Sequence, residues 1–381
     1  MSVAHPDYNI AALRARIPAL ASMIPMCNCS QSPQTDWARD AVERYMGSWR
    51  TRGMDWDAWM QEVNAARAAF AALINASPDD VAVFSSVSEA ASAVASAIDF
   101  TGPRNGVVTT EAEFPTIGHV WLAQEQRGAH VQWAPVRDGA VDPSSYEALI
   151  DERSAVVSVC HAYYLNGALQ DITGITRLAH ERGARVFIDA YQSAGVVPID
   201  VRASGVDFLA SGNLKYLMGI PGIAFLYVNP NGAGSLHPSL TGWFGRANPF
   251  AFNPRQLDWA AGARRFDTGT PPMINAYVAR AGMELIQSIG VEKIRAWHEV
   301  LSERLAAGGK ARGLRIHGGC DSKTANTAFV VGDSHAVENA MRQRGVLPSA
   351  RGPVIRLAPH FYNTIDDIDR ALDVLAEVTK A

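Results

Sequence analysis

The chain has 381 residues, 48% of them hydrophobic and 19% charged, which is enough to form one large folded domain and a smaller one. Its formal net charge of −4 and the lack of any cluster of Lys and Arg give no electrostatic basis for binding nucleic acid or an anionic membrane. No apolar run reaches the length of a membrane span, and the N-terminus lacks a basic region followed by an apolar stretch, so we expect neither membrane insertion nor secretion.

The middle of the chain alternates short β-branched runs with helical patterns, which is typical of a mostly parallel sheet flanked by helices. In chain order, the predicted elements are a helix at 88–98, strands at 105–111 and 154–161, a helix at 172–183, and strands at 184–190, 207–213 and 222–228. Gly183 is placed to end the second helix, because glycine readily adopts the left-handed conformation found at helix C-termini.

After about residue 270 the pattern changes to two long amphipathic helices, at 273–290 and 291–309, followed by mixed strands and helices. A closing helix begins after Thr364, which is placed to cap it, with Asp367 completing a capping box. The sequence thus predicts an α/β protein in three parts: an N-terminal segment (1–30) that packs near the small domain, a large domain (31–270) and a small C-terminal α+β domain (271–381).

The chain contains four cysteines, Cys27, Cys29, Cys160 and Cys320, which are too few for a disulfide scaffold at this length. Cys27 and Cys29 are close enough in sequence to raise the question of a metal site. No second pair of ligands at zinc-like spacing accompanies them, so we expect no bound metal. This usage of cysteine indicates a reducing, cytoplasmic location.

Lys215 is the one Asp, Glu, Lys or Arg between Phe208 and Gly245. A lysine in such apolar company is costly unless it is paired, modified or able to extend its ammonium group into water. The stretch lacks a nucleotide-binding, zinc-protease or serine-hydrolase motif, as does the rest of the chain. Two interpretations remain for Lys215: a packed stem with a solvated ammonium group, or an amine used in imine chemistry.

A pyridoxal phosphate (PLP) enzyme needs a lysine for the cofactor aldehyde, a carboxylate for the pyridine nitrogen, a ring-stacking group and a helix N-terminus for the phosphate. The candidates occur in chain order: Val87 and Ser88, Phe114, Asp189 and Lys215. Taken singly, these residues have ordinary explanations: Ser88 as a helix cap, Phe114 as a core residue and Asp189 as an ion-paired carboxylate. Because parallel strands bring their carboxyl ends to one edge of the sheet, we predict that they meet there and that Lys215 binds PLP.

Several stretches of the chain, from about residue 25 to its end, resemble the class V aminotransferase group of fold-type I PLP-dependent enzymes. The pattern is nearest to kynureninases and is also similar to cysteine desulfurases and isopenicillin N epimerase-like proteins. The matching stretches are EFPT (113–116), HAYYLNGALQDI (161–172), DAYQSAG (189–195), KYLMGIPG (215–222), GWFG (242–245) and RFDTGTPPM (265–273). The resemblance implies the fold of a fold-type I PLP-dependent transferase.

The resemblance also assigns roles to individual residues. Lys215 would hold the cofactor, Asp189 would pair with its pyridine nitrogen, and Phe114 would stack on its ring. Gln192 would bind the phenolic oxygen of the cofactor. The phosphate would be bound by Val87, Ser88 and Ser211, and from the partner subunit by Trp243 and Thr270, which implies a homodimer with shared active sites. Arg356 would bind the α-carboxylate of an amino-acid substrate through its planar guanidinium group.

The chain departs from kynureninases at three positions: Ile117 stands where they carry Asp, Gln192 where they carry His, and Leu214 where they carry Tyr. No cysteine lies between Asp321 and Arg356, which argues against the loop cysteine of a desulfurase. We expect a PLP-dependent enzyme with kynureninase-like lyase or hydrolase chemistry at the β-position of an α-amino acid. The alternatives are an aminotransferase or epimerase of class V, and a PLP-binding protein without catalysis. The sequence shows no second cationic anchor beside Arg356, which argues against a transaminase for dicarboxylates.

Overall fold

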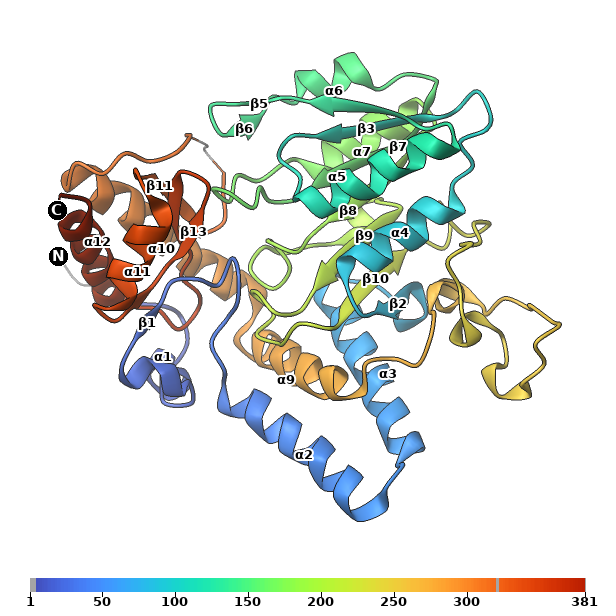
Figure 1. Cartoon of the computed structure of the whole chain (residues 1–381), viewed down its shortest axis with the longest axis horizontal. Helices are drawn as coiled ribbons and strands as arrows, with labels where there is room; N and C mark the ends of the chain where they lie inside the picture. Colours follow the sequence, from blue (N-terminus) through green and yellow to red (C-terminus); the bar gives the residue numbers. More distant parts are fainter. Residues whose placement is uncertain (1–4, 320–321, 381) are drawn as a thin grey trace.

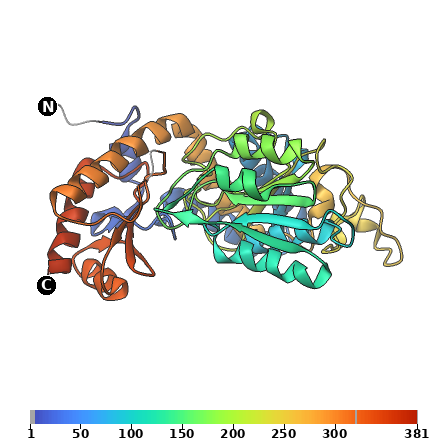
Figure 2. The same ribbon diagram turned by 90° about the horizontal axis from the view of Figure 1, so that it is seen from above.

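The computed structural model describes residues 5–319 and 322–380, so Cys320 lies outside the described residues. Two domains lie side by side (Figures 1 and 2). The larger one is built on a seven-stranded sheet, and the smaller one contains the C-terminal part of the chain together with its N-terminal segment. No helix in the described part of the chain is long and apolar enough to cross a membrane.

The central sheet has the strand order β2-β10-β9-β8-β7-β3-β4. Its strands are β2 (Val81–Phe84), β3 (Gly106–Thr110), β4 (His130–Ala134), β7 (Ser154–Cys160), β8 (Arg185–Asp189), β9 (Phe208–Gly212) and β10 (Ala224–Val228). β10 runs antiparallel to both of its neighbours, and all other pairs are parallel. The mostly parallel sheet is confirmed, and each of the five strands expected from the sequence is present.

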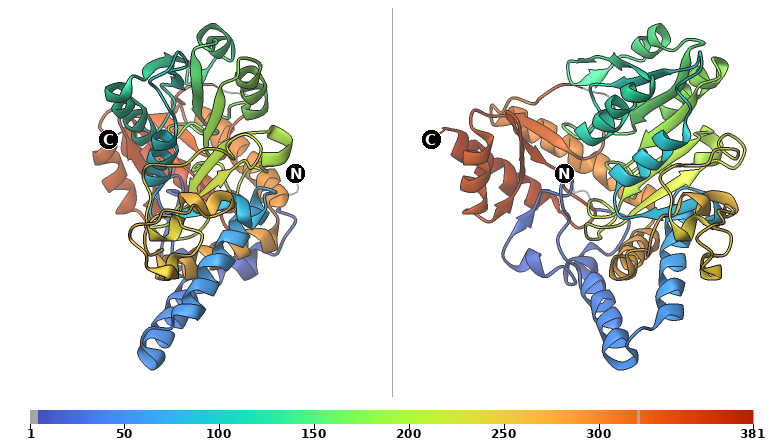
Figure 3. Two further views of the ribbon diagram at one scale, coloured as in Figure 1. Left: turned by 90° about the vertical axis from the view of Figure 1, so that its right-hand side faces the viewer. Right: turned by 45° about the vertical axis from the view of Figure 1, so that its right-hand side comes forward.

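Helices cover both faces of the sheet, which explains why its central strands are apolar along their whole length. In β8, Phe187 faces the layer of α4 (Val87–Ala97) and α5 (Pro115–Leu122), whereas Ile188 faces the opposite layer. That opposite layer contains α2 (Asp36–Arg52), α3 (Trp56–Leu73), α7 (Ile172–Glu181) and α9 (Met273–Ile289). Two shorter helices, α6 (Ser144–Leu149) and α8 (Val201–Ser204), and a hairpin of β5 (Val136–Arg137) and β6 (Ala140–Val141) complete the domain. α2 and α3 form a hairpin that projects from the body of the molecule (Figure 3).

The small domain has a three-stranded sheet covered by helices. Its elements are α10 (Val291–Ala311), β11 (Thr327–Val330), α11 (Ser334–Arg342), β12 (Val346–Leu347), β13 (Ser349–Arg351), β14 (Val354–Leu357) and α12 (Ile365–Lys380). The capping box of α12 is present: the Asp367 amide donates to the Thr364 hydroxyl at 3.2 Å, and the Thr364 amide donates to the Asp367 carboxylate at 3.0 Å.

The N-terminal segment packs on the small domain. It contains α1 (Ile10–Arg14) and β1 (Ile24–Pro25), and β1 pairs in parallel with β12. The Tyr8 hydroxyl donates to the Phe361 carbonyl at 2.7 Å, and Arg14 forms an ion pair with Asp367 at 2.6 Å. Both ends of the chain are thereby attached to the same domain.

The domain boundary expected at residue 270 differs from the point where the packing changes. The buried face of α9, including Ala279 and Met283, belongs to the same hydrophobic core as Phe70 of α3 in the large domain. The chain leaves this core at Gly290, whose φ of +96° ends α9 and directs the chain into α10. An amphipathic helix shows in the sequence that it buries one face, but not which domain covers that face.

Candidate active site

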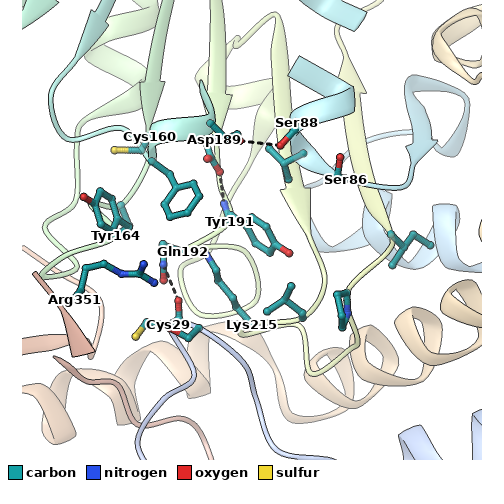
Figure 4. Close-up of a pocket in the computed structure, with 18 of the residues that line it drawn as sticks. Cys29, Ser86, Ser88, Cys160, Tyr164, Asp189, Tyr191, Gln192, Lys215 and Arg351 are labelled. Carbon is teal, nitrogen blue, oxygen red and sulfur yellow. Dashed lines mark hydrogen bonds between the residues drawn. The ribbon is translucent and has the colours of Figure 1, made fainter. Parts of the chain in front are cut away.

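A cavity of about 350 Å³ lies beyond the carboxyl ends of the parallel strands (Figure 4). The strands and the loops that follow them supply most of its lining: β2 leads into α4, β3 into the loop before α5, β8 ends at Asp189, and β9 leads to Lys215. The predicted site residues that line this cavity are Val87, Ser88, Phe114, Asp189, Gln192, Lys215 and Arg356. The structure therefore brings these residues of the sequence-based prediction together at one edge of the sheet.

Lys215 directs its amine toward two aromatic rings of the cavity. Its Nζ lies 4.1 Å from the centroid of the Tyr191 ring and 5.6 Å from that of Phe114. The ammonium group forms no hydrogen bond or ion pair with any described residue. Burial lowers the pKa of Lys215 from its ordinary value of 10.5 to about 8, although Asp189 acts in the opposite direction. Gly212 allows this arrangement, because a side chain at that position would overlap the Tyr191 ring.

The lowered pKa of Lys215 makes its reactivity with aldehydes dependent on pH near neutrality. Only the neutral amine attacks an aldehyde, so we expect the rate of PLP capture by the cofactor-free protein to rise about tenfold per pH unit below pH 8 and to level off above it. Stopped-flow absorbance from about pH 7 to about pH 9.5 measures this rate. The control is N-acetyl-lysine methyl ester, whose rate should continue to rise over the same range, and a protein profile that also keeps rising would contradict the shifted pKa.

Asp189 is a buried carboxylate without a cationic partner in the protein. Its Oδ1 accepts the Tyr191 amide hydrogen at 2.8 Å, and no Lys, Arg or His of the described chain lies within ion-pair distance of it. Burial raises the pKa of Asp189, the effect expected for a carboxylate that has lost its water, although the Tyr191 amide and the charge of Lys215 act in the opposite direction. The ordinary explanation, an ion pair with Arg or Lys, is therefore not what the structure shows. A protonated pyridine nitrogen would supply the missing charge.

Glu113 is a second buried carboxyl group in this region, and the sequence analysis missed it. Neither of its oxygens has a hydrogen-bond partner in the described structure. Burial, together with the nearby charge of Asp189, raises the pKa of Glu113 well above its usual range. The raised pKa favours the neutral form of Glu113. Only the fold reveals this, since Glu113 precedes Phe114 in a stretch that reads as a loop.

Cys160 ends β7 and also lines the cavity. Its thiol donates to the Ala112 carbonyl at 3.3 Å. Burial and the nearby carboxyl group of Glu113 raise the pKa of Cys160 well above its usual range. The group is therefore a thiol rather than a thiolate, and it is not suited to act as a nucleophile.

The N-terminus of α4 forms the part of the cavity suited to a phosphate. Ser86 caps the helix by accepting the Glu89 amide hydrogen at 3.1 Å, and the amides of the first turn, including those of Val87 and Ser88, have no acceptor within the helix. The Ser88 hydroxyl lies 2.9 Å from that of Thr116 in the first turn of α5. Ser86 and Thr116 both line the cavity and are additions to the predicted set.

Ser211 is placed differently from the other predicted phosphate ligands. It is buried within β9, its hydroxyl donates to the Gly212 carbonyl at 2.9 Å, and it is not part of the cavity lining. The predicted strand at 207–213 contains Ser211, but the sequence pattern does not show toward which side of the sheet its side chain points. The phosphate contact of Ser211 stays a prediction without support from this geometry.

Phe114 and Gln192 both line the cavity, and each has a part of its side chain that no other residue covers or hydrogen-bonds. Phe114 is 38% exposed, unusually open for a phenylalanine, and it meets Tyr164 edge to face at 5.4 Å between ring centroids. The Gln192 side-chain amide donates to the Cys29 carbonyl at 3.0 Å, while its Oε1 is buried and has no partner among the described residues. A planar ring with a polar substituent could stack on the Phe114 ring and hydrogen-bond to the Gln192 Oε1.

Arg356 is almost fully buried, with 1% of its surface exposed, and it lines the cavity. It donates to the Tyr164 carbonyl at 2.9 Å, to the Ser30 hydroxyl at 2.8 Å and to the Ser349 hydroxyl at 2.6 Å. No carboxylate of the described residues lies within ion-pair distance of it, and its Nε has no partner. A buried guanidinium group without a counter-ion is costly, which indicates that an anionic ligand completes the site.

Trp243 and Thr270 do not line this cavity in their own chain. Trp243 packs in an aromatic cluster with Trp56, Phe244 and Phe250, in the segment drawn in yellow that extends away from the sheet in Figures 1 and 2. Thr270 is exposed. Their expected contacts with the phosphate therefore depend entirely on a second subunit.

The described residues of the cavity fit PLP, because several of their groups lack a partner within the protein. Asp189 lacks a cation, Lys215 lacks an acid, Phe114 presents an open ring, and the first turn of α4 presents free amides. These groups would hold, in that order, the pyridine nitrogen, the aldehyde, the ring face and the phosphate.

Comparison with known proteins supports the same assignment. The family model described as Aminotransferase class-V matches residues 41–370. The chain is 37% identical over 371 residues to "Uncharacterized aminotransferase YcbU" of Bacillus subtilis (strain 168), covering 96% of this chain and 97% of that protein. It is 29% identical over 288 residues to a kynureninase of Pseudomonas fluorescens, covering 72% of this chain and 67% of that protein. The apo structure of cysteine desulfurase from Thermococcus onnurineus NA1 is similar with a TM-score of 0.88 at 21% identity, covering 100% of both chains.

The fold and the site together define a PLP-dependent enzyme of fold type I. Within that class, the chain belongs to the class V aminotransferase family. When bound, PLP supplies an electron sink for the bonds at the α-carbon of an amino acid. The residues of the chain bind and orient the reactants around it.

Proposed function

We propose that this enzyme binds an α-amino acid through its α-carboxylate and breaks a bond at or beyond the β-carbon, as a lyase or hydrolase. The observation that carries the proposal is Arg356, a buried and unpaired guanidinium group in the same cavity as Lys215. The lowered pKa of Lys215 suits it to take a proton from the α-carbon and return it. The similarity to kynureninase and the stretches 161–172 and 242–245 favour chemistry at the β-position.

Aminotransfer is the second candidate, and one relative and one residue favour it. The relative of 37% identity is named an uncharacterized aminotransferase. Arg351 lines the cavity, so the sequence-based argument that no second cationic anchor stands beside Arg356 was wrong. Arg351 lies in the short segment SARGPV, next to Gly352 and Pro353, which reads in the sequence as an exposed turn.

A single turnover without keto acid distinguishes the two candidates. Purified enzyme is mixed with a panel of amino acids, and both the small-molecule products and the cofactor extracted from the denatured protein are analysed. We expect a cleaved side-chain product and a cofactor that is still in its aldehyde form. A stoichiometric amount of the amine form of the cofactor, converted back only when a keto acid is added, would show that the enzyme is an aminotransferase.

We also propose that the enzyme is a cytoplasmic homodimer, with Trp243 and Thr270 completing the site of the partner subunit. The segment that contains Trp243 carries exposed apolar side chains, Phe250 at 50%, Phe252 at 73% and Leu257 at 52%. An apolar surface of this kind is typical of a contact between proteins. The cysteines Cys27, Cys29 and Cys160 are free thiols, in keeping with a reducing compartment.

A further inference from the structure

Arg351 is a second arginine of the cavity, and the reaction proposed above does not use it. It is the last residue of β13 and lines the cavity. Its side chain is exposed and makes no hydrogen bond or ion pair with any residue in the described ranges. A guanidinium group that enters a binding cavity without a partner is available to an anion.

The strand geometry places Arg351 and Arg356 on one wall of the cavity. Residues two apart on a strand point to the same side, so Arg351 shares a face of β13 with Ser349. The Ser349 hydroxyl accepts a hydrogen bond from Arg356 at 2.6 Å, and Ser349 lies opposite Arg356 in the pairing of β13 with β14. Both arginines also help to lower the pKa of Lys215, so their charges act on the same amine.

Arg351 lies away from the part of the cavity that is suited to the cofactor phosphate. In Figure 4 it lies next to Gln192, whereas Ser86 and Ser88 lie on the far side of Tyr191. The charged side chains that line the cavity are one carboxylate, Asp189, and three cations, Lys215, Arg351 and Arg356. If Asp189 pairs with the cofactor and Arg356 with the α-carboxylate, Arg351 is left without an anion.

We propose that Arg351 binds a carboxylate at the end of the substrate side chain, so that the enzyme selects acidic α-amino acids. The inference rests on the proposed function, in which Arg356 binds the α-carboxylate. A carboxylate matches the planar fork of a guanidinium group, and the amide of the same length does not carry the charge. Arg351 is therefore a specificity-determining residue.

The test measures ligand affinity with the PLP-loaded enzyme, from the change in cofactor absorbance on titration. The ligands are aspartate, glutamate and 2-aminoadipate, their amide counterparts where these exist, alanine, and the amine-free dicarboxylates succinate and glutarate. We expect the acid of best-fitting length to bind about 10- to 100-fold more tightly than its neutral counterpart, the range that one charge-assisted pair supplies. Arg351→Gln should remove this preference and leave the affinity for alanine within about twofold.

Arg344→Gln is the matched control, because it removes a positive charge from an exposed residue of the same domain that does not line the cavity. It should leave the preference for acidic ligands intact. The inference is overturned if the wild-type enzyme shows no preference for any of the three acids, or if Arg351→Gln weakens acid and neutral ligands equally. The proposed function fails in a different way: alanine affinity would then be unaffected by Arg356→Gln, whatever Arg351 does.

Discussion

Replacing Lys215 with alanine is expected to abolish the visible absorbance of the bound cofactor and to lower turnover by on the order of 10⁴-fold, because in the proposed function this one residue would supply both the attachment point for the cofactor and the proton transfer at the α-carbon. The amine has no structural partner in the described chain, so the substitution removes no hydrogen bond or ion pair. Burial lowers the pKa of Lys215 in the folded protein, so its charged form is less favourable there than in the unfolded chain, and the cofactor-free variant should unfold at a temperature no lower than that of the wild type. Absorbance spectra, single-turnover rates and unfolding curves measure the three quantities.

A mixing experiment extends this prediction to the dimer. A Lys215→Ala chain lacks the lysine of its own active site. A Thr270→Ala chain keeps that lysine but should bind the cofactor phosphate of its partner subunit more weakly. If the sites are shared, a heterodimer of the two contains one site with Lys215 and an intact partner Thr270, so part of the activity should return on mixing. A fully active monomer in sedimentation at the assay concentration would refute the shared site, and retained wild-type absorbance in Lys215→Ala would refute the role of the lysine.

Replacing Asp189 with asparagine is expected to lower turnover by about 10²- to 10³-fold, the range seen when one preorganised electrostatic contact is removed from an active site. Asparagine has nearly the same shape, and its side-chain oxygen can still accept the Tyr191 amide hydrogen that Asp189 accepts at 2.8 Å. The change therefore removes the charge that would keep the pyridine nitrogen protonated. Steady-state kinetics with saturating cofactor measures the loss.

The same substitution should affect stability in the opposite direction. Burial raises the pKa of Asp189 in the folded protein, so its ionised form is less favourable there than in the unfolded chain. This destabilisation is absent well below the ordinary carboxyl pKa and fully present above the raised one. The cofactor-free Asp189→Asn protein should thus unfold at a temperature no lower than that of the wild type, and PLP should stabilise it less. A large loss of stability in the cofactor-free variant would indicate a structural role for the carboxylate instead.

The parts of the site that the sequence could indicate share one property: each contrasts with its neighbours along the chain. Asp189 ends an apolar strand, and Lys215 is the one charged residue in a long uncharged stretch. Such a contrast can be recognised in the sequence alone. The rule that parallel strands bring their carboxyl ends to one edge of the sheet then predicts that the marked residues lie close together. The five central strands were predictable for the same reason, since their apolar runs are bounded by polar segments.

Other parts of the site have no such contrast. Arg351 ends a strand of only three residues, and Glu113 stands in a polar turn, so their places in or beside the cavity follow only from the packing of distant elements. The antiparallel direction of β10 is also invisible in the sequence, because a strand buried on both faces has the same apolar pattern in either direction. The packing of α9 with the large domain is a further case, decided by which partner covers its apolar face.

The contact between Ser30 and Arg356 joins residues 326 positions apart, and the pairing of β1 with β12 closes the same long loop. During synthesis, the elements that would hold the cofactor, from β2 to the loop with Lys215, leave the ribosome well before β14 does. The contacts around Arg356 can therefore form only after the strands that surround Lys215 have been made, and they depend on both ends of the chain meeting.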